Sequence, residues 1–233
     1  MVVGTRQNVR QLPDISVQFM NTTVMPSPTA KNLGVTFDAT LSFDVHVSDV
    51  VRRCTGVLSG LCHSRHYLPR DTLVTLVQAL AVSTVRYAIS VYGVCGITQT
   101  RRLQRLLNFG ARVVSGRRKF DHISDVMRDL QWLSAENMWR FQSVMLLKKM
   151  LTTGQPESLR ERITSRSSLH GCSTRQADHP QVPMIRTEAG RRRFLYSAVE
   201  MYNRLPASVR DLNLLRFKKE YRALLLREQY GDD

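Results

Sequence analysis

The pattern of apolar and polar positions changes near residue 44. Before it, Ile15 to Phe19 alternates apolar and polar residues, and Leu33 to Phe37 is a second run with strand-like composition. Period-two alternation predicts strands, and the Asn21-Thr22-Thr23 run between them predicts a turn. Residues 1–43 therefore predict a short β-hairpin or meander. Because two or three short strands rarely stand alone, we expect this element to lean on the following helices or to continue a larger sheet.

From residue 44 onward, apolar residues recur at helical spacing. The first helical segment has one apolar face, made of Val47, Val50, Val51, Cys54, Val57, Leu58 and Leu61. Gly56 and Gly60 lie on this segment, and because glycine lowers helix propensity we expect a close helix contact there. After Pro69, Asp71 is positioned to cap the next helix. That helix, over about 72–92, is apolar nearly all round and is expected to be central.

Helical periodicity continues to about residue 151 and then fades. Thr98 is expected to cap a third helix, a short helix is predicted over 123–130, and Ser134 is expected to cap a longer one ending near Leu151. Residues 152–186 are rich in Ser, Thr, Arg, Gly and Pro and predict a linker or long loop. Two helical segments, separated at Pro206, follow it. The predicted fold class is mainly α, a helical bundle preceded by a β element, with parts at 1–43, 44–151, 152–186 and 187–233.

Composition and net charge reduce the range of candidate functions. The 233 residues are 42% hydrophobic and 23% charged, which is typical of a chain with a packed core. Lys and Arg number 34 against 19 acidic residues, a net charge of +15. Such an excess indicates a polyanionic partner, nucleic acid before membrane. The uncharged run Thr72 to Val85 is shorter than the roughly 20 residues of a membrane-spanning helix, so no span is expected.

The N-terminal residues and the number of cysteines indicate the cellular compartment. The N-terminal residues have no apolar run of the kind found in signal peptides, and four cysteines are too few for a disulfide scaffold. We expect an intracellular protein, with nucleus and cytoplasm left open.

The predicted third helix carries the strongest functional signal. No acidic residue occurs from Thr98 to Phe120, and arginines lie opposite the apolar stripe together with an aromatic residue. Arginines supply charge for phosphates and an aromatic ring supplies a stacking surface. The predicted nucleic-acid-binding residues are Arg101, Arg102, Arg105, Phe109, Arg112, Arg117, Arg118 and Lys119.

Metal and nucleophile chemistry have little support. The candidate metal ligands are Cys54, Cys62, His63, His170, Cys172 and His179. They lack the paired-cysteine spacing of structural zinc sites, so no metal is expected. The sequence also has no nucleophile elbow and no glycine-rich phosphate loop.

Two acidic runs spell polymerase-like motifs. The chain ends Tyr230-Gly231-Asp232-Asp233, and Phe37 to Asp44 resembles a first palm motif in its spacing. Polymerase carboxylates hold two metals about 4 Å apart and need a strand setting that neither run has. We interpret both as coincidence, with Asp44 expected to cap a helix.

Several short runs in fixed order nevertheless resemble a known family. Val2 to Arg6, Lys31 to Val35, Phe37-Asp38, Leu41 to Phe43 and His46 resemble the segment after the catalytic palm of non-LTR (LINE-type, jockey-like) retrotransposon reverse transcriptases. The resemblance continues through Tyr87, Leu103 to Arg105, Asn108, Ala111-Arg112, His122, Leu130 to Leu133, Val182-Pro183, Arg186-Thr187, Gly190 and Asn203 to Pro206.

The resemblance implies a role for each part of the chain. Residues 15–38 would be the primer-grip hairpin, with Leu33, Gly34 and Val35 at its core. Residues 44–151 would be the thumb, which packs along a template–primer duplex, and the remainder would be the C-terminal helical region. The expected partners are RNA or an RNA/DNA template–primer duplex and the missing N-terminal polymerase portion.

The resemblance also implies what this chain lacks. The family's fingers, palm, metal-binding aspartates and endonuclease would precede Met1, so we expect no polymerase activity from this chain alone and no cofactor. The Mg²⁺ of the parent family would belong to the missing palm. Three alternatives stay open: a complete reverse transcriptase recorded in shortened form, a basic helical module that binds an acidic protein, and a decayed fragment that never folds.

Overall fold

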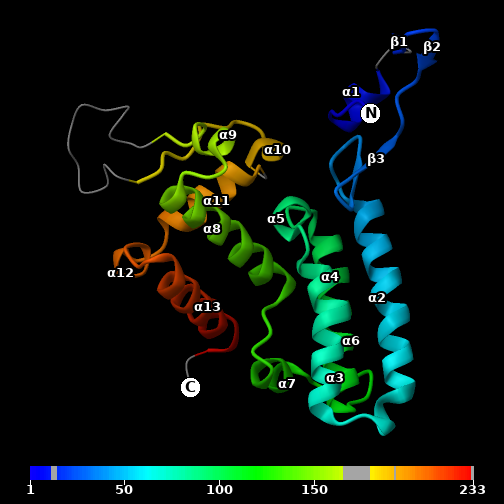
Figure 1. The fold of residues 1–233 in the computed structure, drawn as a ribbon, viewed down its shortest axis with the longest axis vertical. Helices are drawn as coiled ribbons and strands as arrows, with labels where there is room; N and C mark the ends of the chain where they lie inside the picture. Colours follow the sequence, from blue (N-terminus) through cyan, green and yellow to red (C-terminus); the bar gives the residue numbers. More distant parts are fainter. Residues whose placement is uncertain (12–14, 165–178, 192, 232–233) are drawn as a thin grey trace. The chain divides into compact units, whose positions relative to one another are not determined.

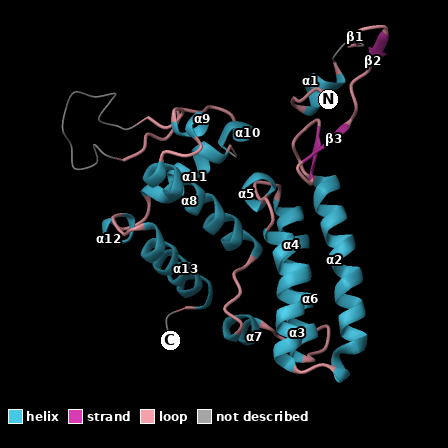
Figure 2. Ribbon diagram, in the orientation of Figure 1, coloured by secondary structure: helices cyan, strands magenta, loops and turns pink. Residues whose placement is uncertain are grey.

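The computed structural model describes residues 1–11, 15–164, 179–191 and 193–231. Among these residues, helices predominate and two small antiparallel hairpins lie near the N-terminus (Figure 2), which confirms the predicted fold class. The candidate metal ligands His170 and Cys172 and the terminal Asp232 and Asp233 lie outside the described residues.

The N-terminal region contains a short helix and two hairpins. β1 pairs with β2 and β3 pairs with β4, and each pair is antiparallel. Every residue of β1 and β2 is exposed, whereas Val35 at the start of β4 is buried and β4 packs on α2. The second hairpin is therefore the one that belongs to the core. The bounds are α1 Arg6–Arg10, β1 Val17–Phe19, β2 Thr22–Val24, β3 Thr29–Asn32 and β4 Val35–Asp38.

The loop from β4 into α2 (Asp44–Ser64) is organised by one carboxylate. Asp38 accepts hydrogen bonds from the backbone N–H groups of Thr40, Ser42 and Phe43 at 3.0, 3.1 and 2.7 Å. The hydroxyls of Thr40 and Ser42 donate to it as well. Asp38 therefore has a structural role in this loop.

The start of α2 corrects one expectation. Asp44 does not cap the helix: Phe43 occupies the N-cap position with φ 60°, and Asp44 is the first helical residue. Its carboxylate instead accepts a 2.6 Å hydrogen bond from Gln99 Nε2. Asp44 thus joins α2 to the following long helix.

Residues 1–88 and 95–123 form one compact unit, built around helices that pack on α2. α2 and α6 lie side by side (Figure 1), and Asp44 contacts Gln99 while Ser48 contacts Arg102, so the two helices run in the same direction. Val47, Leu58, Val77, Leu103 and Leu107 are buried between the helices. The remaining bounds in this unit are η1 Arg65–Tyr67, α3 Arg70–Val77, η2 Gln78–Val82, α4 Ser83–Arg86 and α6 Ile97–Ser115.

The predicted single helix over 72–92 is wrong. The chain passes from α3 through a π-helical turn, η2, into α4, and helical geometry ends at Arg86. Tyr87 is extended, and Ala88 has φ 53°. A π turn adds one residue to the helical repeat, and the left-handed residue then redirects the backbone. The last predicted turn becomes a separate helix, α5 (Ile89–Tyr92).

Three smaller expectations about helices are also wrong. Gly56 and Gly60 make no close helix contact: both are exposed, and a Cβ at either position would meet nothing within 4 Å. α2 packs through its other face, with Cys54 buried there. Asp71 lies inside the first turn of α3, whose N-cap is Pro69. α6 begins one residue before Thr98, with Gly96 at its N-cap.

Residues 89–94 and the chain from Ser124 onward form the second compact unit. α8 is its central helix and packs against α11 and α13, with Val144, Leu147, Ala198, Phe217 and Leu225 buried. Ser134 caps α8 by accepting from Asn137 N at 3.1 Å, which confirms the predicted cap. The bounds are α5 as above, α7 Ser124–Asp129, α8 Ala135–Thr153, α9 Glu157–Arg160, α10 Glu188–Arg191, α11 Phe194–Asn203, α12 Ala207–Arg210 and α13 Leu214–Tyr230.

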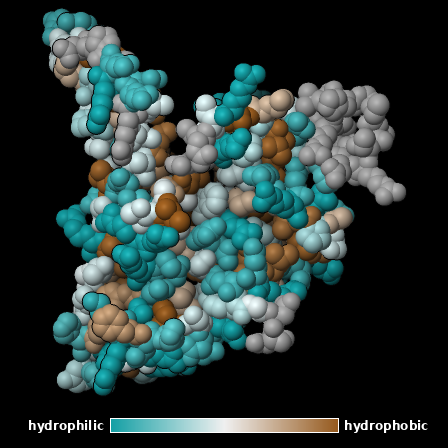
Figure 3. All heavy atoms as spheres, turned by 180° about the vertical axis from the view of Figure 1, so that it is seen from behind, coloured by the Kyte–Doolittle hydropathy of each residue, from teal (hydrophilic) through white to brown (hydrophobic). Residues whose placement is uncertain are grey.

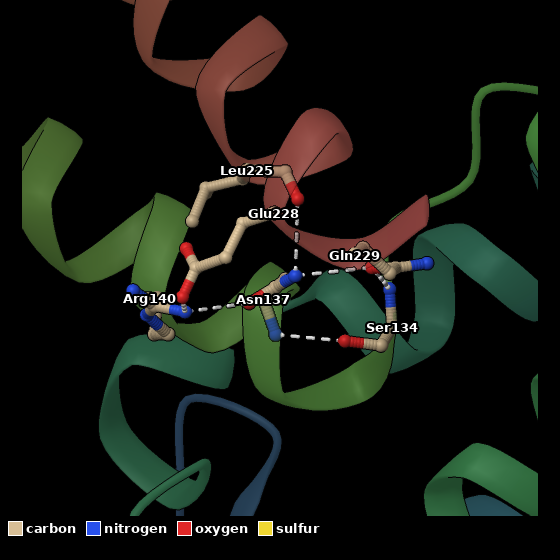
Figure 4. Close-up of polar contacts among 6 residues, drawn as sticks. All are labelled: Ser134, Asn137, Arg140, Leu225, Glu228 and Gln229. Atoms are coloured by element: carbon tan, nitrogen blue, oxygen red, sulfur yellow. Dashed lines mark hydrogen bonds and ion pairs between the residues drawn. The ribbon is translucent and has the colours of Figure 1, made fainter. Parts of the chain in front are cut away.

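A polar network fixes the start of α8 to the end of α13 (Figure 4). Asn137 Nδ2 donates to the carbonyl of Leu225 at 3.3 Å and to Gln229 Oε1 at 3.1 Å. Arg140 Nη1 donates to Asn137 Oδ1 and to Glu228 Oε1, both at 3.0 Å. Because Asn137 is buried, these bonds satisfy an amide that would otherwise destabilise the core.

The predicted boundaries at residues 43, 151 and 186 rest on changes in the composition and periodicity of the sequence, and they stay predictions. Part of the predicted linker is helical, since α9 lies within it. In the portion of the chain that the structure describes, no helix combines the length and hydropathy needed to cross a membrane.

Candidate nucleic-acid interface

α6 separates an apolar and a basic side. Its apolar residues are buried, among them Leu103, Leu107 and Val114. Arg101, Arg105 and Arg112 are spaced four and seven residues apart, which places them on one side of a helix with a period of 3.6. Burial of the apolar side against α2 and α3 therefore fixes the orientation of the basic side.

The basic side of α6 borders a pocket with a volume of about 640 Å³, which we call the basic pocket. Five cationic side chains line it, and none of the described residues that line it is acidic. These cations come from η1, from α6 and from the loop after α6, so segments about 40 residues apart in the chain converge there. The lining residues are Cys62, Arg65, Arg105, Asn108, Phe109, Arg112, Val113, Arg117 and Lys119.

The structure thus brings together five of the predicted binding residues, Arg105, Phe109, Arg112, Arg117 and Lys119. Sequence reasoning missed Arg65, Cys62 and Asn108 as members of the same site. Asn108 could have been predicted, since it lies between Arg105 and Arg112 on the same side of α6. Nothing in the sequence places Arg65 and Cys62 in the pocket, because they reach it only through the parallel packing of α2 and α6.

Hydrogen bonds to carbonyl oxygens orient two of these guanidinium groups. Arg112 Nε donates to the carbonyl of Arg118 at 3.1 Å, and Arg112 Nη2 donates to the carbonyl of Asp121 at 3.3 Å. Arg117 Nη1 donates to the carbonyl of His122 at 2.5 Å. Carbonyls are neutral, so the bonds of Arg112 hold its position and leave its positive charge to act on a ligand.

The other predicted residues lie around the basic pocket rather than in it. Arg102 is half-buried and donates to Ser48 Oγ and Gln99 Oε1, both at 2.9 Å, and it lines a second, smaller pocket of about 320 Å³. Arg101 and Arg118 are exposed and line neither pocket. They are positioned to add charge at the surface.

Aromatic rings accompany the cations. Phe109 is half-buried and lines both pockets. Tyr67 and Phe120 are 89% and 90% exposed and are near neighbours in sequence of Arg65 and Lys119. Lys119 Nζ lies 5.5 Å from the centroid of the Phe120 ring. Exposed rings beside cations are typical of surfaces that bind unpaired bases.

The hydrophobic residues at the surface do not gather in one place. On the face drawn in Figure 3, hydrophobic residues form separate patches among hydrophilic ones. The basic pocket is distinguished by its five cations together with the ring of Phe109, and not by apolar area alone.

The predicted primer-grip-like residues are placed at and beside one turn. Leu33 and Gly34 form the two-residue connection between β3 and β4, with φ 44° and 82°, whereas Val35 is buried in the core. Two positive φ values are typical of the type I′ turn that suits a hairpin. Leu33 is 83% exposed at the tip.

Tyr87 fixes this turn. Its hydroxyl donates to the carbonyl of Leu33 at 2.8 Å. A Cβ at position 34 would lie 3.4 Å from Tyr87 Cε1, so glycine there lets the ring approach closely. The redirected backbone at Tyr87 and Ala88 thereby positions the hairpin tip.

Titratable groups elsewhere favour structural roles. Burial raises the pKa of the Cys54 and Cys95 thiols, which disfavours their reactive thiolate forms. Burial lowers the pKa of His46, whose Nδ1 accepts from Thr36 N at 3.4 Å. Within the described ranges, no group of three or more His, Cys, Asp or Glu residues is arranged to hold a metal ion.

Comparison with known proteins connects this chain to transposons. No family model and no solved structure matches it. Over 111 residues, or 46% of the chain, it is 28% identical to a Drosophila melanogaster protein described as a probable RNA-directed DNA polymerase from transposon X-element. The matched region is 12% of that protein's length. The similarity supports a relationship between this chain and the RNA-directed DNA polymerases of transposons.

Proposed function

We propose that this chain is the C-terminal part of a transposon RNA-directed DNA polymerase and that it binds nucleic acid through the basic side of α6. The observation that carries this proposal is the convergence of five cations around one pocket with an aromatic ring in its lining. A net charge of +15 supports it, because phosphates are the polyanion that arginine clusters bind most widely.

The finer assignments follow from the family resemblance and are part of the same proposal. Residues 44–151 act as a thumb that contacts template and primer, and Leu33, Gly34 and Val35 act as the primer grip. Polymerisation itself needs carboxylates that hold two metals, and by the resemblance these belong to the palm. The chain alone therefore binds RNA or a template–primer duplex without extending it.

The salt dependence of binding tests the basic side of α6. Each phosphate contact contributes roughly 0.7 to 0.9 to the slope of log affinity against log salt concentration. Replacing Arg105 and Arg112 together with Ala should therefore reduce the slope by about 1.4 to 1.8. The measurement is a fluorescence-anisotropy titration of labelled RNA and of a labelled template–primer duplex at several salt concentrations.

The matched control removes two exposed cations from another helix. Lys218→Ala with Lys219→Ala changes the net charge equally, and both residues are exposed on α13. We expect this variant to keep the wild-type slope. Equal losses in both double variants would mean that net charge alone drives binding and would contradict an interface on α6. Stronger binding to an acidic polypeptide than to RNA would favour the protein-interaction alternative.

A further inference from the structure

We propose that the basic pocket receives one unpaired nucleotide of a single-stranded nucleic acid, with the base against Phe109 and the phosphate among the arginines. This inference rests on the proposed function, because it specifies which form of nucleic acid the interface prefers. It differs from a role in holding a duplex, in which every base is paired and stacked.

The shape of the site favours an unpaired nucleotide. A basic stripe that follows a duplex backbone needs only a surface, but here the cations surround a hollow of about 640 Å³. This volume is in the range of sites that enclose small molecules, of roughly 300 to 1,000 Å³. A base enters such a hollow only when it is outside the stack.

The lining of the pocket is divided into an apolar part and a cationic part. Phe109 and Val113 are one helical turn apart on α6 and supply apolar surface, while Arg105 and Arg112 precede and follow Phe109 by four and three residues. A nucleotide has the same division, with a flat apolar base face joined to an anionic phosphate. A polyanion without bases would use only the arginines.

The pocket also contains an oriented amide. Gln104 Nε2 donates to Asn108 Oδ1 at 2.8 Å, which engages the acceptor end of the Asn108 amide. The Nδ2 group of an asparagine is a donor suited to the acceptor atoms on the edge of a base. Asn108 directly precedes Phe109 on α6, with Arg105 before the two and Arg112 after them, and it lines the same pocket.

Two exposed rings are close in sequence to cations that line the pocket. Tyr67 follows Arg65 by two residues and Phe120 follows Lys119 directly, and both rings are almost fully exposed. Stacking of successive bases on aromatic side chains is the common way in which proteins hold single strands. Exposed rings next to pocket cations are therefore available to neighbouring unpaired bases.

The experiment compares a single-stranded RNA with a blunt duplex of the same length, using wild-type chain, Phe109→Leu and Tyr196→Leu. Leucine keeps the apolar character of position 109 and removes the flat ring. Loss of one stacked base should weaken single-strand binding roughly 5- to 100-fold and leave duplex binding unchanged. Tyr196 lies on α11 in the other compact unit, so its variant should bind as wild type does.

A second measurement uses wild-type chain and does not depend on a variant that folds. Cys62 is half-exposed and lines the basic pocket, whereas Cys54 and Cys95 are buried. Single-stranded RNA should slow the alkylation of Cys62 by iodoacetamide at least several-fold, as read by mass spectrometry of the Cys62 peptide. The duplex and inorganic phosphate, at equal phosphate concentration, should leave the rate nearly unchanged.

The outcomes separate this inference from the proposed function. If Arg105→Ala with Arg112→Ala weakens binding but duplex protects Cys62 as well as single strand does, the function stands and the inference is wrong. The same holds if Phe109→Leu weakens binding to both forms equally. If wild-type chain binds neither form, both are wrong.

Discussion

Asp38 shows at the scale of one residue how a carboxylate that could be mistaken for a catalytic group serves the fold. It accepts from the backbone N–H groups of Thr40, Ser42 and Phe43 and from two hydroxyls, and so closes the loop that leads into α2. Burial alone would raise its pKa, but the bonds from Thr40, Ser42 and Phe43 outweigh burial and the net pKa is lowered.

The lowered pKa predicts how stability depends on pH. A carboxyl group with a folded-state pKa below its unfolded value stabilises the fold above the unfolded pKa, near 3.9, and loses that contribution as pH falls through the folded pKa. Wild-type chain should therefore lose more stability than Asp38→Asn between about pH 5 and pH 2. At pH 7, Asp38→Asn should be less stable by about 1 to 3 kcal/mol, because it removes acceptors from backbone N–H groups.

Urea unfolding at a series of pH values measures both effects. Asp49→Asn is a suitable control, since Asp49 is on the exposed side of α2 and its ion pair with Arg52 is at the surface. An identical pH profile for wild type and Asp38→Asn would show that the carboxylate does not stabilise the loop.

At the scale of elements, the sequence predicted the helices and strands that have a regular local pattern of apolar and polar residues. Alternation predicted strands that overlap β1 and β4, and helical spacing placed α2, α6 and α8, with Ser134 confirmed as a cap. Alternation missed β3, and it placed Leu33 and Gly34 within a strand, whereas they form the turn between β3 and β4. The break at Tyr87 and Ala88 was missed because nothing in an apolar run indicates a π turn or a left-handed residue. At that break Tyr87 bonds to the Leu33 carbonyl, 54 residues earlier in the chain, a contact that no local pattern encodes.

The residues of the candidate site also fall into those that local sequence predicts and those that it does not. The arginines of α6 could be read from a single helix, because charge and periodicity lie in one stretch of sequence. Arg65 could not, since its place in the basic pocket depends on two helices running in parallel. Arg102 shows the converse. The sequence predicted it as one of the arginines of this helix, but it did not predict the bonds of Arg102 to Ser48 and Gln99.

The contact between Tyr87 and the hairpin gives a prediction at this scale. Tyr87→Phe removes one hydrogen bond to Leu33 and keeps the ring against Gly34, so it should destabilise the docked hairpin by about 1 kcal/mol. Hydrogen exchange should become several-fold faster at the amides of residues 30–37 and stay unchanged in α8, which lies in the other unit.

Tyr67→Phe is the matched control, because Tyr67 is 89% exposed. It should leave exchange in the hairpin as in wild type. Uniform acceleration in both units for Tyr87→Phe would mean that the residue affects the whole fold and does not position the hairpin.

At the scale of the whole molecule, the proposed function separates binding from chemistry. In the proposed function, the basic pocket, the exposed rings and the hairpin tip contact the nucleic acid, and none of them is assigned a part in nucleotidyl transfer. Nucleotidyl transfer by two metals requires carboxylates that hold both ions about 4 Å apart. By the family resemblance these carboxylates belong to the palm, so the two tasks would lie on different parts of a longer protein.

This separation predicts that purified chain incorporates no nucleotides in a primer-extension assay with Mg²⁺, under conditions in which it binds the same template–primer. A known reverse transcriptase serves as the positive control, and the Arg105→Ala, Arg112→Ala variant shows that the binding belongs to α6. The reading frame upstream of Met1 should encode an aromatic-x-Asp-Asp motif, and a chain extended to include that palm should extend the primer. Incorporation by the chain alone, if it persists through purification, would place catalytic carboxylates within these 233 residues and overturn the proposal.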